Sequence, residues 1–124
     1  MSVLALVRCL HILAGTLWSG AAVVIAVYIL PAAKAAGPGG AAVLRQLTSV
    51  RKLPQTLLTL AAVTVFSGVY LIWVASAGFQ AGWFESRVGE AYSLGGAAAL
   101  GAFLIGSIIN IPTANRIGAL ARAA

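Results

Sequence analysis

The first long apolar segment of this chain reads CLHILAGTLWSGAAVVIAVYIL, from Cys9 to Leu30, and contains no charged residue. A bilayer core of about 30 Å needs roughly 20 helical residues at about 1.5 Å each. Two further segments, Leu57–Ala77 and Tyr92–Ile111, are also uncharged and long enough. The sequence therefore predicts an all-α fold, a polytopic transmembrane helical bundle with three spanning helices in one membrane domain over residues 1–124.

The composition supports lipid as the solvent of this protein. Hydrophobic residues make up 61% of the chain and charged residues 8%, against about 45–50% and about 25% in an average soluble domain. The net charge is +6, but the basic residues lie between the apolar segments without interleaved aromatic residues, which argues against nucleic acid as a partner. With Cys9 as the single cysteine, the chain can form neither an intrachain disulfide nor a Cys-x-x-Cys site.

The distribution of basic residues predicts the topology. Lys and Arg accumulate on the cytoplasmic side of membrane proteins. Six of the eight basic residues lie in the first loop or in the C-terminal tail: Lys34, Arg45, Arg51, Lys52, Arg116 and Arg122. We therefore predict a multi-pass protein of the bacterial inner (plasma) membrane, with the N-terminus outside and the first loop and C-terminus in the cytoplasm.

A basic amphipathic helix is predicted over residues 41–53, in the first loop. Its apolar residues recur at helical spacing and oppose basic and polar residues. Such a helix can lie at the headgroup boundary, with its basic side chains on anionic lipids; a connector helix that packs on the bundle is the alternative. The run Gly37–Gly40 is expected to break the chain before it, and Pro54 suits the first turn of the second span. The second loop, residues 78–91, is expected along the outer surface with one short helix.

Small residues predict how the spans associate, because helices in lipid approach closely through small side chains. The third span has the clearest stripe, and the first and second spans offer smaller sets. The stripe contains Gly95, Ala98, Ala102, Gly106 and Asn110. The other sets are Gly15 with Ser19, Thr16 with Gly20, and Thr64 with Ser67 and Gly68. These faces predict a homo-oligomer or a partner membrane subunit, and the Asn110 amide is expected to bond a neighbouring helix or to line a path for a substrate or ion.

His11 is the only ionisable side chain inside a predicted span, and such residues are functional hypotheses by default. Helical spacing places Arg8, His11, Gly15 and Trp18 on one face. Gly15 would leave room beside the imidazole and Trp18 would form a wall one turn deeper, so a flat cofactor could fit there.

Several roles for His11 stay open. It could hydrogen-bond a neighbouring helix, relay protons, or ligate haem b with Arg8 pairing a propionate and Trp18 against the ring. Copper is disfavoured because Cys9 and His11 point to nearly opposite sides of a helix. No serine–histidine–carboxylate set, intramembrane carboxylate pair or phosphate-binding loop is found in the sequence. Glu85 and Glu90 flank Arg87 in a polar loop as solvated charges, so we expect no enzymatic activity.

One resemblance adds to this interpretation. Leu10-His11-Ile12, then Trp18-Ser19-Gly20 and an aliphatic run to Pro31, resembles the first helix of CopD-like copper-resistance proteins and HemJ-type protoporphyrinogen oxidases. Most of the chain resembles bacterial integral membrane proteins related to them. That resemblance is carried by Gly78-Phe79 with Trp83, Gly95-Gly96, Ala102-Phe103 with Gly106, and Pro112-Thr113-Ala114 with Arg116.

The resemblance to the HemJ type implies a haem-engaging histidine at His11 and no other carried-over residue. An intramembrane lysine of those enzymes has no counterpart in the spans here, which argues against oxidase activity. The resemblance also implies a fourth spanning helix beyond Ala124, so that the chain would be part of a longer protein. We thus expect a non-enzymatic helical-bundle subunit or scaffold, with a haem-binding redox protein as the first alternative and copper uptake or resistance as the second.

Overall fold

The computed structural model describes the backbone of residues 2–110 and the side chains of residues 2–108. Within this part the chain is helical and forms no strand. Three helices are long and apolar enough to cross a membrane: Val3–Ala35 (mean hydropathy 2.0), Leu53–Ala75 (2.1) and Arg87–Ile108 (1.5). The predicted fold class, a bundle of three apolar helices with a further helix between the first two, is confirmed.

The first long helix contains α1 (Val3–Val24), a π-helical turn η1 (Ile25–Ile29) and α2 (Leu30–Ala35). Ser2 caps it, accepting a hydrogen bond from the Ala5 N–H at 3.3 Å. The π-helical turn ends at Ile29, two residues before Pro31, whose ring would otherwise collide with the carbonyl one turn back. At 33 residues the helix is about 50 Å long. It extends beyond the predicted span 9–30 because helical hydrogen bonding continues past the charged residues that limit an apolar segment.

The helix of the first loop consists of α3 (Pro38–Arg45) and a π-helical turn η2 (Gln46–Val50). It begins three residues before the predicted start at 41, because only Gly37, with φ of +57°, breaks the chain. Pro38 takes the first helical position, and Gly40 is helical and lies against the Ala33 carbonyl, where a side chain would collide. The predicted chain break is therefore present, but it lies at Gly37 alone, and Pro38–Gly40 belong to the helix. Lys52, in the left-handed region at φ 53°, separates this helix from the next.

The second and third long helices form a hairpin. Helix α4 (Leu53–Ala75) has Pro54 in its first turn, as predicted, and a turn through the buried Ser76 leads to the short helix α5 (Ala81–Phe84) expected in the second loop. Helix α6 (Arg87–Ile105) continues into the π-helical turn η3 (Gly106–Asn110). Ser86 caps α6 by accepting from the Gly89 N–H at 3.1 Å. These helices begin before the predicted spans 57–77 and 92–111, for the reason given for α1.

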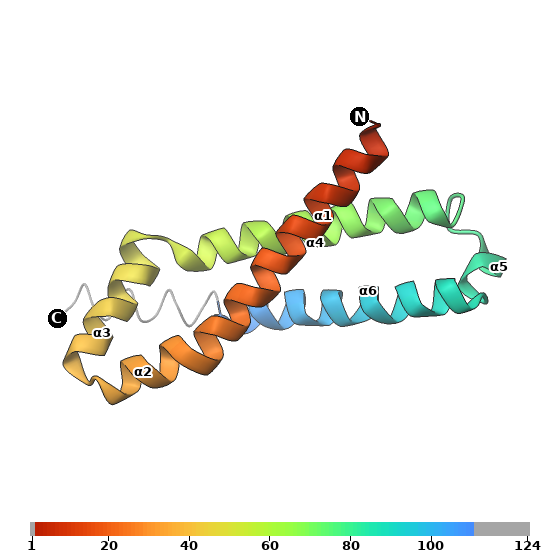
Figure 1. Ribbon diagram of the computed structural model, residues 1–124. Helices are drawn as coiled ribbons and strands as arrows, with labels where there is room; N and C mark the ends of the chain where they lie inside the picture. The colour runs from red at the N-terminus through yellow and green to blue at the C-terminus, as the bar shows by residue number, and fades with distance from the viewer. Residues whose placement is uncertain (1, 111–124) are drawn as a thin grey trace.

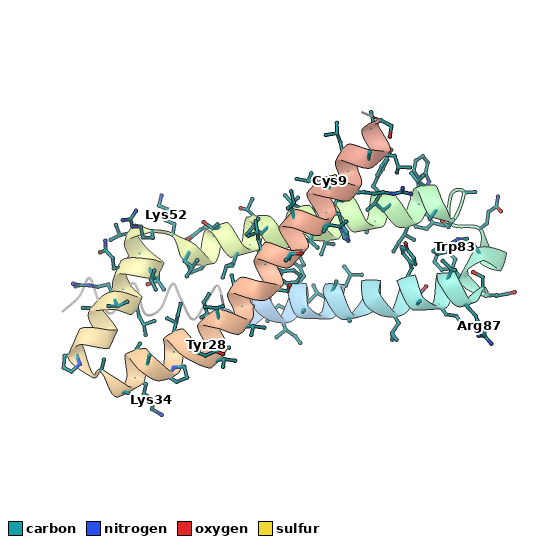
Figure 2. The ribbon with its side chains drawn as sticks, in the orientation of Figure 1. Cys9, Tyr28, Lys34, Lys52, Trp83 and Arg87 are labelled. Carbon is teal, nitrogen blue, oxygen red and sulfur yellow. The ribbon has the colours of Figure 1, made fainter. Side chains whose placement is uncertain are left out.

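Helix α4 lies between the other two long helices. It packs extensively on α1, which crosses it obliquely, and on α6, which returns alongside it (Figure 1). Lys34 and Lys52 lie at one end of the molecule, and Trp83 and Arg87 lie at the other (Figure 2). The basic first loop and the aromatic second loop are therefore at opposite ends of the bundle.

Burial is the reverse of that in a soluble protein. Within the described part of the chain, the only buried apolar residues are Ala14, Ala33 and Ala61. Large apolar side chains face outward, as Leu94 (75% exposed) and Phe66 (71% exposed) illustrate. Water would penalise so much exposed apolar surface, whereas lipid would not. The arrangement is that of a polypeptide with a hydrocarbon solvent.

Candidate functional site

His11 contacts the middle of α4. Its Nδ1 lies 2.9 Å from the carbonyl oxygen of Thr64 and 3.0 Å from Oγ of Ser67. Thr64 and Ser67 are buried, and His11 itself is half-buried. The imidazole thus joins α1 to α4 by a hydrogen bond within the segments that are long and apolar enough to span a membrane.

This contact assigns the tautomer of the imidazole. A carbonyl oxygen can only accept a hydrogen bond, so the Nδ1 atom of His11 carries the proton and donates it to Thr64. The Ser67 hydroxyl already donates within its own helix, to the carbonyls of Val63 and Thr64, and can accept from the same N–H. In the neutral ring the Nε2 atom then holds a lone pair. The unprotonated nitrogen is left available as an acceptor or a ligand.

Two glycines allow this close approach. A Cβ added at Gly68 would lie 2.9 Å from Cε1 of His11, and one added at Gly15 would lie 3.2 Å from Cγ2 of Thr64. The space that the sequence analysis expected beside Gly15 is therefore filled by Thr64. The small-residue faces predicted on the first two spans do meet each other here.

A groove of about 730 Å³ lies beside His11, between the N-terminal part of α1, the C-terminal half of α4 and the middle of α6. Arg8 and His11 line it from α1, Gly68 from α4, and Tyr92 and Gly95 from α6. Most of the other lining side chains are apolar. The groove has the size typical of sites for small ligands, which are about 300–1,000 Å³.

Trp18 does not line this groove. It shares the half-buried face of α1 with His11 and Gly15, as predicted, but lies further along the helix than the groove extends. Of the three candidate site residues, the structure thus brings Arg8 and His11 to one groove and leaves Trp18 outside it.

Cys9 is exposed on α1. Among the described residues, no three His, Cys, Asp or Glu side chains are close enough together to hold a metal ion. Glu85 and Glu90 are exposed near the start of α6, as is Arg87 between them. Their place in the hairpin agrees with the expected solvated charges.

The small-residue stripe predicted on the third span does not face α4. Ala98 and Ala102 are exposed, and Gly95 has no atom of another residue near its Cβ position. Instead, Gly96 faces α4, and a Cβ added there would lie 3.5 Å from Cδ1 of Ile72. The side chain of Asn110, for which a bonding role was predicted, lies outside the described side chains.

Sequence reasoning missed the partners of His11 and the groove. Thr64, Ser67 and Gly68 were recognised as a contact face, but nothing in the sequence connected them with His11, which is 53 residues from Thr64. A usable signal was their polarity, since hydroxyl groups in the centre of a span require partners. Tyr92 entered the sequence analysis only as the first residue of the third predicted span.

Comparisons with protein-family models, with curated proteins and with solved structures find no match to this chain. The site must therefore be interpreted from its own chemistry.

Proposed function

We propose that this protein is a non-enzymatic subunit or scaffold of the bacterial inner membrane, which assembles with copies of itself or with a partner membrane subunit. One observation carries the proposal: Ala98 and Ala102 on α6 are exposed and do not line the groove beside α4. Small residues allow another helix to approach closely in lipid, where packing and hydrogen bonds rather than the hydrophobic effect drive association. In this proposal the role of His11 is structural: its hydrogen bond to Thr64 holds α1 against α4.

Its test is the oligomeric state of the purified protein in mild detergent. Ala98→Leu with Ala102→Leu should dissociate the oligomer, because two leucines would hold a facing helix away. Ala97→Leu is the matched control, since Ala97 is exposed on the same helix beside the stripe. A monomeric parent protein, or an oligomer indifferent to the double substitution, would remove the proposal.

We also propose an orientation of the bundle in the membrane. The ends of the bundle differ in charge, and the end with Lys34, Arg45, Arg51 and Lys52 would lie in the cytoplasm, on anionic lipid headgroups. In a Cys9→Ala background, an impermeant maleimide added to intact spheroplasts should label Ser86→Cys, and Ser49→Cys only after lysis. The opposite labelling would reverse the topology.

A second candidate, a haem-binding redox protein, is favoured by the bonding of His11. A ring fixed through Nδ1–H to a carbonyl, with the Nε2 lone pair free, is the usual arrangement of a metal-ligating histidine. His11 would be the axial ligand and Arg8, on the same groove, would pair a propionate. Haem would supply one-electron chemistry. The described residues fit these two roles, and Trp18 takes no part.

An absorption spectrum distinguishes the candidates. After expression with a haem supply, the second candidate requires a Soret band that His11→Ala abolishes and Trp18→Phe, outside the groove, preserves. A colourless protein removes it. The first candidate requires that His11→Ala still assembles.

A further inference from the structure

The groove beside His11 is open along its side. Several of its apolar lining residues are themselves strongly exposed, among them Ile12 (62%), Val69 (45%) and Leu100 (44%). Because the surroundings of these residues are hydrocarbon, a ligand could enter directly from the bilayer. An occupant should therefore have an apolar chain rather than being a soluble polar molecule.

Arg8 is the only charged side chain among the residues that line the groove. It forms no ion pair with an acidic side chain in the described part of the chain, where Glu85 and Glu90 are the only acids. Arg8 is exposed, so its guanidinium group is accessible to an anion at the groove. The planar guanidinium group binds phosphate through two parallel hydrogen bonds. Arg8 thus indicates an anionic, preferably phosphate-bearing, head group.

His11 adds a second requirement. It lies three residues after Arg8, one helical turn or about 4.5 Å deeper along α1. In the neutral ring its Nε2 can only accept, because the single N–H is at Nδ1 and donates to Thr64. A ligand that satisfies Nε2 must therefore carry a hydroxyl or amide N–H about one turn below its acid. Ester carbonyls cannot supply this hydrogen bond.

We propose that the groove binds one single-chain phospholipid: the phosphate pairs with Arg8, the free glycerol hydroxyl donates to Nε2 of His11, and the acyl chain lies along Gly95 and Gly96. In a lysophospholipid, the glycerol hydroxyl stands between the phosphate and the acyl chain, which is the order that Arg8 and His11 require. Tyr92, in the N-terminal part of α6, also lines the groove, and its phenol hydroxyl is a further donor for the phosphate. A diacyl phospholipid has an ester where the free hydroxyl is needed.

This inference goes beyond the proposed assembly through α6. Either of the two can be disproved while the other stands. A haem in the groove would use the same Arg8 and His11, so a Soret band sensitive to His11→Ala would overturn the lipid inference. The oligomer tested with the α6 substitutions would be unaffected by that result.

The experiment measures binding of 1-palmitoyl lysophosphatidic acid to delipidated protein in mild detergent. The deoxy analogue, with hydrogen in place of the glycerol hydroxyl, and dipalmitoyl phosphatidic acid are the comparison lipids. Both should bind about tenfold or more weakly, because each lacks the hydroxyl hydrogen bond. Arg8→Gln should weaken the binding of lysophosphatidic acid by about tenfold to a hundredfold, the range expected for loss of a charge-assisted hydrogen bond.

A second variant tests the groove without touching the α1–α4 contact. Gly95 has open space at its Cβ position, so Gly95→Leu should fill the groove and abolish binding while the melting temperature is retained. His11→Phe should remove the preference for the hydroxyl-bearing lipid over its deoxy analogue. Equal binding of the three lipids, or binding unaffected by both Arg8→Gln and Gly95→Leu, would overturn the proposal.

Discussion

Helix α4 meets the other two long helices of the described chain, α1 and α6, in different ways. Against α1 it places Thr64, Ser67 and Gly68, which are in contact with His11 or Gly15, and the closest of these approaches leaves no room for another carbon atom. Against α6, the approach of Gly96 to Ile72 is an ordinary van der Waals contact, and Gly95 faces open space.

The difference shows that small residues alone do not close a helix pair. Both contacts contain glycines, but only the α1–α4 contact pairs them with a side chain that fills the space and forms a hydrogen bond. In lipid no hydrophobic penalty closes the remaining gap. The α4–α6 side therefore keeps a groove at the place where the α1–α4 side has a hydrogen-bonded seam.

The largest expected effect is at Gly68. Gly68→Leu would drive a branched side chain into the His11 ring and separate α1 from α4. We expect a loss of about 1–3 kcal/mol, the usual cost of overpacking, measured by detergent-induced unfolding followed by tryptophan fluorescence. Gly20→Leu, on an exposed part of α1 with nothing near its Cβ position, is the matched control. Equal losses in the two variants would mean that the α1–α4 seam is not tightly packed.

A smaller effect is expected from the hydrogen bond itself. His11→Leu should lower the free energy of unfolding by about 0.6–1.7 kcal/mol, the range for hydrogen bonds between helices in membranes. Ser67→Ala should cost less, because the Thr64 carbonyl still accepts, and the double variant should be less destabilised than the sum.

The control for this pair is Ser19→Ala, because the Ser19 hydroxyl bonds only carbonyls of its own helix. It should be nearly neutral in the same unfolding measurement. Strict additivity of His11→Leu and Ser67→Ala would contradict a shared hydrogen bond.

The smallest effect is expected on the α6 side. Gly96→Ala should change stability by no more than about 0.5 kcal/mol, because its added methyl group would make only an ordinary contact with Ile72. The same unfolding assay measures it. A loss as large as that of Gly68→Leu would show that α4 and α6 are packed as closely as α1 and α4, and the contrast between the two sides would disappear.

Sequence patterns predicted the helices better than their ends. The three apolar segments and the short helix of the second loop are present, but Arg8, Lys34 and Arg87 all lie inside helices that the charge boundaries had placed them outside. Hydrogen bonding continues along the backbone whatever the charge of the side chain. The face of α6 that meets α4 was not identified, because a chain rich in Ala and Gly offers several equivalent small faces.

His11 illustrates the same limit at the candidate site. Its isolation in an apolar segment marked it from the sequence as the residue to examine, together with Arg8. Its partners could not be deduced, because the Thr64 carbonyl is a backbone atom that every residue possesses, and 53 positions separate the two.

Three features follow from composition and order: the apolar surroundings, the helical character of residues 3–110 and the uneven charge of the loops. They do so because the cost of placing a residue in hydrocarbon is a property of that residue. Which glycine meets which side chain, which ring nitrogen keeps its lone pair and where a groove remains are properties of pairs of helices. They depend on the crossing of α1 over α4 and the spacing of α6 beside it, so they exist only once the three helices are packed together.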